Sequence, residues 1–113
     1  MKDGYIRAAA MTPKIKVADC EYNIDNIKTL MSEAHKKDTA IAVFPEMCIT
    51  GYTCNDLFLH DRLLDAALEG LVILKHFSET VKGMISFVGL PYEMNGKLYN
   101  VVAGIMNGCI LGM

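Results

Sequence analysis

The strongest constraint on the fold of this 113-residue chain is a short apolar run that stops at a proline. The run is Ile41-Ala42-Val43-Phe44, and Pro45 ends it, because proline cannot donate a hydrogen bond to a neighbouring strand. A continuous apolar run that follows a helical pattern is typical of a strand buried on both faces of a parallel arrangement. The run therefore predicts the second strand of a β-α-β unit.

The residues before this run predict the rest of the unit. The apolar run from Tyr5 to Met11, closed by Thr12-Pro13, predicts a first strand. From Ile24 to Ala34, apolar residues recur at three- and four-residue steps, which predicts a helix that ends at about Lys37. Asn23 precedes this pattern and is a candidate N-cap.

The second half of the chain changes from a helical pattern to strands. The apolar residues from Leu63 to Phe77 lie on one helical face, which predicts a second helix. Three apolar runs then predict strands over 84–90, 98–106 and 109–111. Asn95-Gly96 and Asn107-Gly108 supply the positive φ angles of tight hairpin turns. The expected order is β-α-β-α-β-β-β, an α/β fold.

Two features predict that the native domain extends beyond Met113. The last residues, Cys109-Ile110-Leu111-Gly112-Met113, form an apolar run without a charged tail, whereas chain termini are usually exposed and frayed. A sheet with only two helices would also leave one face uncovered. We therefore expect residues 1–113 to be part of a larger domain.

Composition and charge limit the type of protein and the kinds of molecule that it binds. Hydrophobic residues make up 52% of the chain and charged residues 21%, which is typical of a soluble protein with a core and excludes disorder. Eleven Lys and Arg oppose thirteen Asp and Glu without a run of like charge, so we expect no nucleic acid and no membrane as partner. No apolar stretch reaches the ~18 residues of a membrane span, and the start lacks the layout of a signal peptide. We expect a cytoplasmic protein with a small-molecule or protein partner.

The four cysteines are expected to be reduced thiols, because nothing in the sequence suggests secretion. Cys48, Cys54 and His60 are spaced by six residues, a pattern that invites a zinc interpretation. No Cys-x-x-Cys pair and no fourth ligand accompany them, so we expect no metal site. Cys48 and Cys54 are instead expected to be small buried apolar side chains.

The main candidate catalytic residue is Glu46, which comes directly after the predicted buried strand. In open α/β sheets ligands bind at the carboxyl ends of the strands. Phe44, Pro45 and Met47 would partly desolvate the carboxylate, and desolvation raises the pKa of a glutamate toward the range useful for a general base. The alternative is a surface glutamate after a turn, and spacing alone leaves both interpretations open.

Phe44-Pro45-Glu46, followed after three residues by Thr50-Gly51-Tyr52, resembles the glutamate motif of the nitrilase (carbon-nitrogen hydrolase) superfamily. Further segments resemble the N-terminal glutaminase domain of the glutamine-dependent NAD synthetases: Arg7-Ala8-Ala9-Ala10, Lys16-Val17-Ala18-Asp19 with Asn23, and Thr53-Cys54 with Asp56-Leu57-Phe58. The resemblance covers essentially the whole chain. It implies that residues 1–113 are the N-terminal portion of such a domain, a nitrilase-like four-layer αββα sandwich that is incomplete at its C-terminus.

The resemblance also implies a triad of glutamate, lysine and cysteine, in which Glu46 is the general base. A thiol attacks the carboxamide, the lysine stabilises the oxyanion, and a thioester forms. The family's lysine and nucleophilic cysteine lie beyond Met113, so none of the four cysteines of this chain is assigned as the nucleophile. Tyr52 matches a tyrosine near the glutamine pocket and is a candidate substrate-binding residue. Thr50 and Gly51 are expected to shape the turn.

The function implied by the resemblance is glutamine hydrolysis that supplies ammonia for the ATP-dependent amidation of deamido-NAD. The amidase step would need no cofactor, whereas ATP and Mg²⁺ are expected for an NAD synthetase domain elsewhere in the complete protein. The implied partners are glutamine or another small amide, that synthetase domain, and further copies of the protein in a homo-oligomer. The 113-residue chain alone is expected to be inactive.

Three alternatives accompany this hypothesis. The first is a stand-alone amidase or carbamoylase of the same superfamily, and the second is a non-catalytic assembly module. A flavodoxin-like doubly wound domain is disfavoured, because the last three predicted strands lack helical crossovers.

Overall fold

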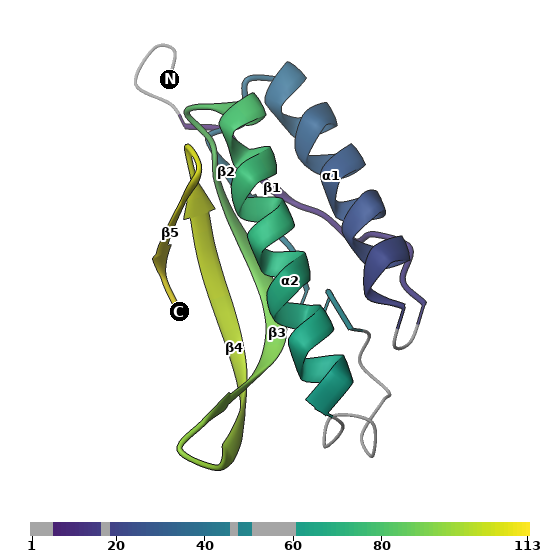
Figure 1. Ribbon diagram of the computed structural model, residues 1–113. Coiled ribbons are helices and arrows are strands. Elements are labelled where there is room, and N and C mark those ends of the chain that lie inside the picture. Colours follow the sequence, from purple (N-terminus) through teal and green to yellow (C-terminus); the bar gives the residue numbers. More distant parts are fainter. Residues whose placement is uncertain (1–5, 17–18, 46–47, 51–60) are drawn as a thin grey trace.

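The computed structural model describes residues 6–16, 19–45, 48–50 and 61–113. Within these residues five strands form one mixed sheet in the order β1-β2-β3-β4-β5 (Figure 1). β1, β2 and β3 are parallel, and β3, β4 and β5 are antiparallel. The strands are β1 (Ala8–Ala10), β2 (Ile41–Val43), β3 (Ile85–Met94), β4 (Lys97–Met106) and β5 (Cys109–Gly112); the helices are α1 (Cys20–Lys36), α2 (Asp61–Phe77) and the 3₁₀ helix η2 (Ser78–Val81). The predicted order of strands and helices is confirmed.

The first helix begins one turn earlier than its apolar pattern predicts. The N-cap of α1 is Asp19, whose Oδ1 accepts a hydrogen bond of 3.0 Å from the backbone N–H of Tyr22. The prediction that Asn23 is the N-cap is therefore wrong. Cys20 extends the buried face of the helix by a turn, and the side chain of Asn23 bonds elsewhere.

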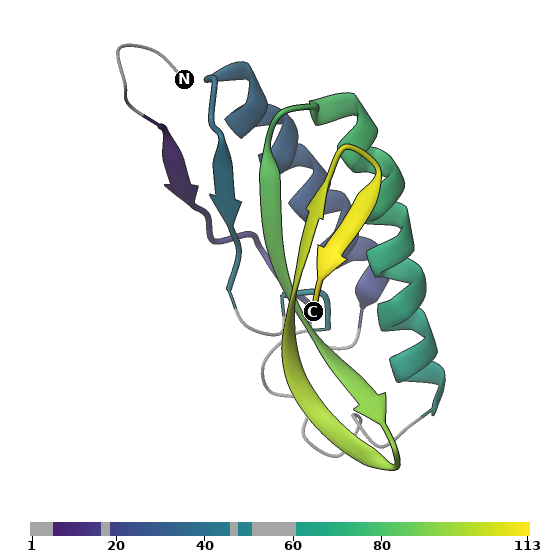
Figure 2. The same ribbon diagram turned by 90° about the vertical axis from the view of Figure 1, so that its left-hand side faces the viewer.

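Both helices cover the same face of the sheet. Figure 2 shows the strands in front of α1 and α2, which lie side by side behind them. The strand side chains on the helix-facing side alternate along the register, and the fully buried ones are Ala42, Ser86, Val88, Leu90, Ala103 and Ile105. Together with the inner faces of α1 and α2 these residues form the hydrophobic core.

The other face of the sheet is apolar and, within the described residues, carries no helix. Val43 is 43% exposed and Val102 is 48% exposed. Phe87 lies across the backbone of Gly104, where an added Cβ would meet its ring at 3.2 Å. The prediction that two helices leave one sheet face uncovered therefore holds for the described part of the chain.

The two tight turns are those that the sequence predicts. Asn95 and Gly96 have φ angles of +54° and +77°, and Asn107 and Gly108 have φ angles of +52° and +81°. Two successive positive φ angles are the geometry of a two-residue hairpin turn, which matches the right-handed twist of the strands it joins. These turns pair β3 with β4 and β4 with β5.

One buried polar atom lacks a partner within the described residues. The hydroxyl of Ser86 faces the core from β3 and makes no hydrogen bond to any residue that the structure describes, although Ser86 is fully buried. A buried hydroxyl without a hydrogen-bond partner lowers the free energy of unfolding, because it loses its bonds to water on folding. Removing the hydroxyl removes this penalty. We expect Ser86→Ala to raise the free energy of unfolding by about 1 kcal/mol, measured by urea denaturation.

The matched control is Ser78, which is also fully buried. Its Oγ donates to the backbone oxygen of Lys75 and accepts a bond of 2.8 Å from the N–H of Gly108. Ser78→Ala is expected to lower the free energy of unfolding by about 1 kcal/mol, since it leaves these groups unpaired. If Ser86→Ala destabilised the protein as much as Ser78→Ala, the assignment of an unpaired hydroxyl would be wrong.

Candidate functional site

The segment that follows β2 is tied to the neighbouring strand on both sides of the predicted base. The N–H of Phe44 donates to the backbone oxygen of Phe87 at 3.0 Å, and the N–H of Ile49 donates to that of Gly89 at 3.2 Å. Phe44 is 5% exposed, and Ile49 is fully buried. Phe44 and Ile49 are five residues apart, but their partners in β3 are only two residues apart, so the register of β2 does not continue to Ile49. Both residues nevertheless bond to β3 at the carboxyl end of the parallel strands.

The predicted general base Glu46 lies outside the described residues, as does the predicted substrate-binding residue Tyr52. Both assignments stay predictions. Of the two residues predicted to shape the turn, Thr50 is buried in a turn over residues 48–50, and Gly51 lies outside the described part of the chain.

Cys48 is the titratable group nearest to Glu46 in the described sequence, and it is not activated. Its Sγ accepts a hydrogen bond of 3.4 Å from the N–H of Gly89 and donates one of 3.7 Å to the oxygen of the same residue. Burial raises the pKa of the Cys48 thiol from 9.0 to about 11, although the bond to Gly89 acts in the opposite direction. A thiol with this pKa stays protonated at neutral pH and is a poor nucleophile.

The prediction that Cys48 is a small buried apolar residue is confirmed, because its side chain is fully inaccessible. Cys54 and His60, the other members of the pattern weighed for zinc, lie outside the described residues. Among the residues that the structure describes, no three His, Cys, Asp or Glu side chains are grouped so as to hold a metal ion.

Asn23 is the residue of this region that sequence reasoning misread. It lies fully buried in the first turn of α1. Its Oδ1 accepts from the N–H of Lys16 at 2.7 Å, and its Nδ2 donates to the oxygen of Lys16 at 2.9 Å and to that of Ile49 at 2.8 Å. A signal was present in the sequence, since Asn23 precedes Ile27 and Met31 at four-residue steps and shares their buried face.

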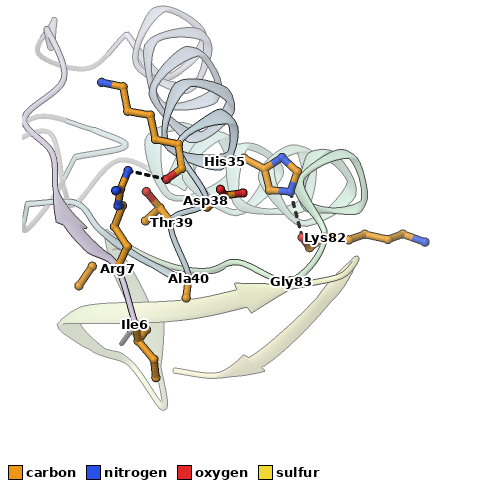
Figure 3. Close-up of a pocket in the computed structure, with 10 residues that line it drawn as sticks. Ile6, Arg7, His35, Asp38, Thr39, Ala40, Lys82 and Gly83 are labelled. Atoms are coloured by element: carbon orange, nitrogen blue, oxygen red, sulfur yellow. Dashed lines mark hydrogen bonds between the residues drawn. The ribbon is translucent and has the colours of Figure 1, made fainter. Parts of the chain in front are cut away.

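A hollow of about 790 Å³ lies at the opposite end of the sheet, where β1, β2 and β3 begin (Figure 3). Two of the polar side chains that line it, those of Arg7 and His35, bond to backbone oxygens. Arg7 Nη1 donates to the oxygen of Lys37 at 2.6 Å, and His35 Nε2 donates to that of Lys82 at 3.0 Å. These bonds tie the end of α1 to the segments that precede β1 and β3, which is a structural role.

Among the described residues, no helix combines the length and the apolar character that crossing a membrane requires.

Comparison with known proteins assigns the family. The sequence model described as carbon-nitrogen hydrolase matches residues 7–109. The chain belongs to the carbon-nitrogen hydrolase family. This confirms the predicted superfamily, and the match includes the Phe44-Pro45-Glu46 motif.

The relatives most similar in sequence include glutamine-dependent NAD(+) synthetases. The protein of Mycobacterium tuberculosis (strain ATCC 25618 / H37Rv) is 32% identical over 110 residues, which cover 97% of this chain and 16% of that protein. The protein of Aquifex aeolicus is 33% identical over 97 residues, covering 86% of this chain and 17% of that protein. The chain thus spans about a sixth of the length of these relatives.

Solved structures of this superfamily share the fold. A glutamine-dependent NAD(+) synthetase from Cytophaga hutchinsonii superposes with a TM-score of 0.86 at 32% identity, over 93% of this chain and 18% of that one. An amidase from Nesterenkonia sp. superposes with a TM-score of 0.81 at 19% identity, over 99% of this chain and 43% of that one. The predicted nitrilase-like α/β fold is confirmed.

Proposed function

We propose that residues 1–113 are the N-terminal portion of the glutamine amidohydrolase domain of a glutamine-dependent NAD synthetase. The observation that supports this most is the identity of 32% to the Mycobacterium tuberculosis synthetase along 97% of the chain. The superposition on the Cytophaga hutchinsonii synthetase, also at 32% identity, adds to it. The amidase of the same fold is only 19% identical, so sequence favours the synthetase over a stand-alone amidase.

In the proposed reaction Glu46 is the general base. It accepts the proton of a cysteine thiol, the thiolate attacks the glutamine carboxamide, and a lysine stabilises the oxyanion that forms. The proton passes to the leaving nitrogen, ammonia departs, and a thioester remains. Glu46 then accepts a proton from water, which attacks the thioester and releases glutamate and the free thiol.

The lysine and the nucleophilic cysteine of this triad would come from residues outside the chain. The state of Cys48 supports that division, because a fully buried thiol with a pKa of about 11 is unsuited to attack an amide. Tyr52 would line the glutamine pocket. Because the nucleophilic cysteine and the lysine of the triad would be missing, the 113-residue chain alone would be inactive.

The remaining assignments extend the same proposal to the complete protein. Amide hydrolysis would need no cofactor, and the ammonia would pass to a synthetase domain that uses ATP and Mg²⁺ to amidate deamido-NAD. The complete protein would be a cytoplasmic homo-oligomer. Its partners would be glutamine, or another small amide, and its own synthetase domain.

The test is an assay of the full-length polypeptide that carries this chain. We expect it to release glutamate from glutamine and to form NAD from deamido-NAD when ATP and Mg²⁺ are present. Hydrolysis of amides without NAD formation would identify a stand-alone amidase or carbamoylase instead. The absence of both activities from the folded protein would favour a non-catalytic assembly module.

A further inference from the structure

The side chain of Asn23 joins two segments that are far apart in the sequence. Its three hydrogen bonds reach the backbone of Lys16, before α1, and of Ile49, after β2, and none is longer than 2.9 Å. Both N–H groups of the amide are used, and its oxygen accepts once. Only a side chain with two donors and an acceptor at this length makes this set of bonds, which aspartate and leucine do not.

The segment held by Asn23 is also held from the sheet. Ile49 donates its N–H to Gly89 of β3, and the thiol of Cys48 exchanges hydrogen bonds with the same residue. From the third side, α2 approaches at Gly70, where an added Cβ would lie 3.5 Å from Ile49 Cγ2 and 3.0 Å from Ile24 Cδ1. Ile49 is thus held by α1, α2 and β3 together, and Cys48 is held by β3.

We propose that Asn23 is a positioning residue of the amidohydrolase site: its carboxamide anchors Ile49, and loss of this anchor lowers the rate of amide hydrolysis. This role rests on the proposed function, in which Glu46 precedes Ile49 by three residues. Asn23 itself is fully buried and contacts backbone, so it acts through this segment and is not a catalytic residue.

The expected kinetic signature is a loss of kcat with little change in KM. A displacement of about 1 Å at a catalytic group costs on the order of 100-fold in rate. We therefore expect Asn23→Ala to lower kcat for glutamine hydrolysis about 100-fold, while KM changes less than about threefold. A residue needed only for stability would lower the amount of folded enzyme and leave the kcat of the folded fraction unchanged.

Cys48 supplies a readout that needs no activity, because it is buried in the segment that Asn23 holds. We propose to alkylate the full-length protein with iodoacetamide and to follow the peptide that contains Cys48 by mass spectrometry. Asn23→Ala is expected to raise the labelling rate of Cys48 at least about tenfold, since local opening exposes the thiol. Cys109, which is exposed, serves as the internal reference in every sample.

The matched control is Asn26, one turn further along the same helix. Its Nδ2 donates to the oxygen of Tyr22 at 2.9 Å within α1, so its loss releases no other segment. Asn26→Ala is expected to leave both kcat and Cys48 labelling unchanged. Asn23→Ser, whose shorter hydroxyl does not reach Ile49, is the second variant, for use where Asn23→Ala does not fold.

The outcomes separate this proposal from the function on which it rests. Unchanged Cys48 labelling in the folded Asn23 variants overturns the anchoring role, whatever the activity. Faster labelling with an unchanged kcat overturns the positioning role. A wild-type protein that hydrolyses no glutamine overturns the proposed function and the positioning role with it, whereas the labelling rates still show whether Asn23 anchors the segment.

Discussion

Glutamine hydrolysis by the full-length protein is expected to fall about 1,000-fold when Glu46 is replaced by glutamine, because general-base catalysis contributes roughly 10²–10⁴-fold to such rates. The amide of glutamine has nearly the size of the carboxylate and accepts no proton at neutral pH. Release of glutamate from glutamine measures the effect. NAD formation with ammonium salts as the nitrogen source is expected to stay at the wild-type rate, since that reaction bypasses amide hydrolysis.

The pairing of these two assays makes the result specific. A misfolded variant would lose both activities, whereas loss of the base removes only the glutamine-dependent one. Glu33→Gln, on the exposed face of α1, is the control for a change of one negative charge and is expected to be silent. If Glu46→Gln kept more than about a tenth of the glutamine-dependent rate, Glu46 would not be the general base.

The order of strands and helices was predictable because each element has a strong local pattern. Pro45 marks the end of β2 to within two residues, and both Asn-Gly dipeptides form the expected turns. β3, in contrast, runs through Pro91 to Met94, beyond the predicted end at residue 90. Its partner β2 ends opposite Phe87, so within the described sheet Pro91 is paired with β4 alone. Proline, which has no N–H to donate, is tolerated where a strand has a neighbour on one side only.

The candidate site was predictable as a motif but not as a set of contacts. Glu46 follows from its place after an apolar run and from the motif around it, and its role stays a prediction. Asn23 was misread because local rules assign an asparagine before a helical pattern to the N-cap. The bond that defines its position runs to Ile49, 26 residues away, and no local periodicity encodes such a contact.

The packing of α2 against the core predicts a large loss of stability when one of its buried residues is truncated. Leu74 is fully buried, whereas its neighbour Ile73 on the same helix is 45% exposed. Truncating a buried leucine removes transfer free energy and leaves a cavity, so Leu74→Ala is expected to lower the free energy of unfolding by about 3 kcal/mol. Ile73→Ala is expected to cost less than about 1 kcal/mol, since its side chain stays half in water and alanine favours the helix.

Urea denaturation followed by circular dichroism compares the two variants in the same protein, with the denaturant dependence of each transition as the check on two-state unfolding. Leu74 belongs to the cluster that joins both helices to the sheet, and the loss of about 3 kcal/mol is a large share of the roughly 5–15 kcal/mol that stabilises a domain. Equal losses for Leu74→Ala and Ile73→Ala would mean that α2 presents a different face to the core. A large loss at Ile73 alone would mean instead that its exposed side is covered in the complete protein.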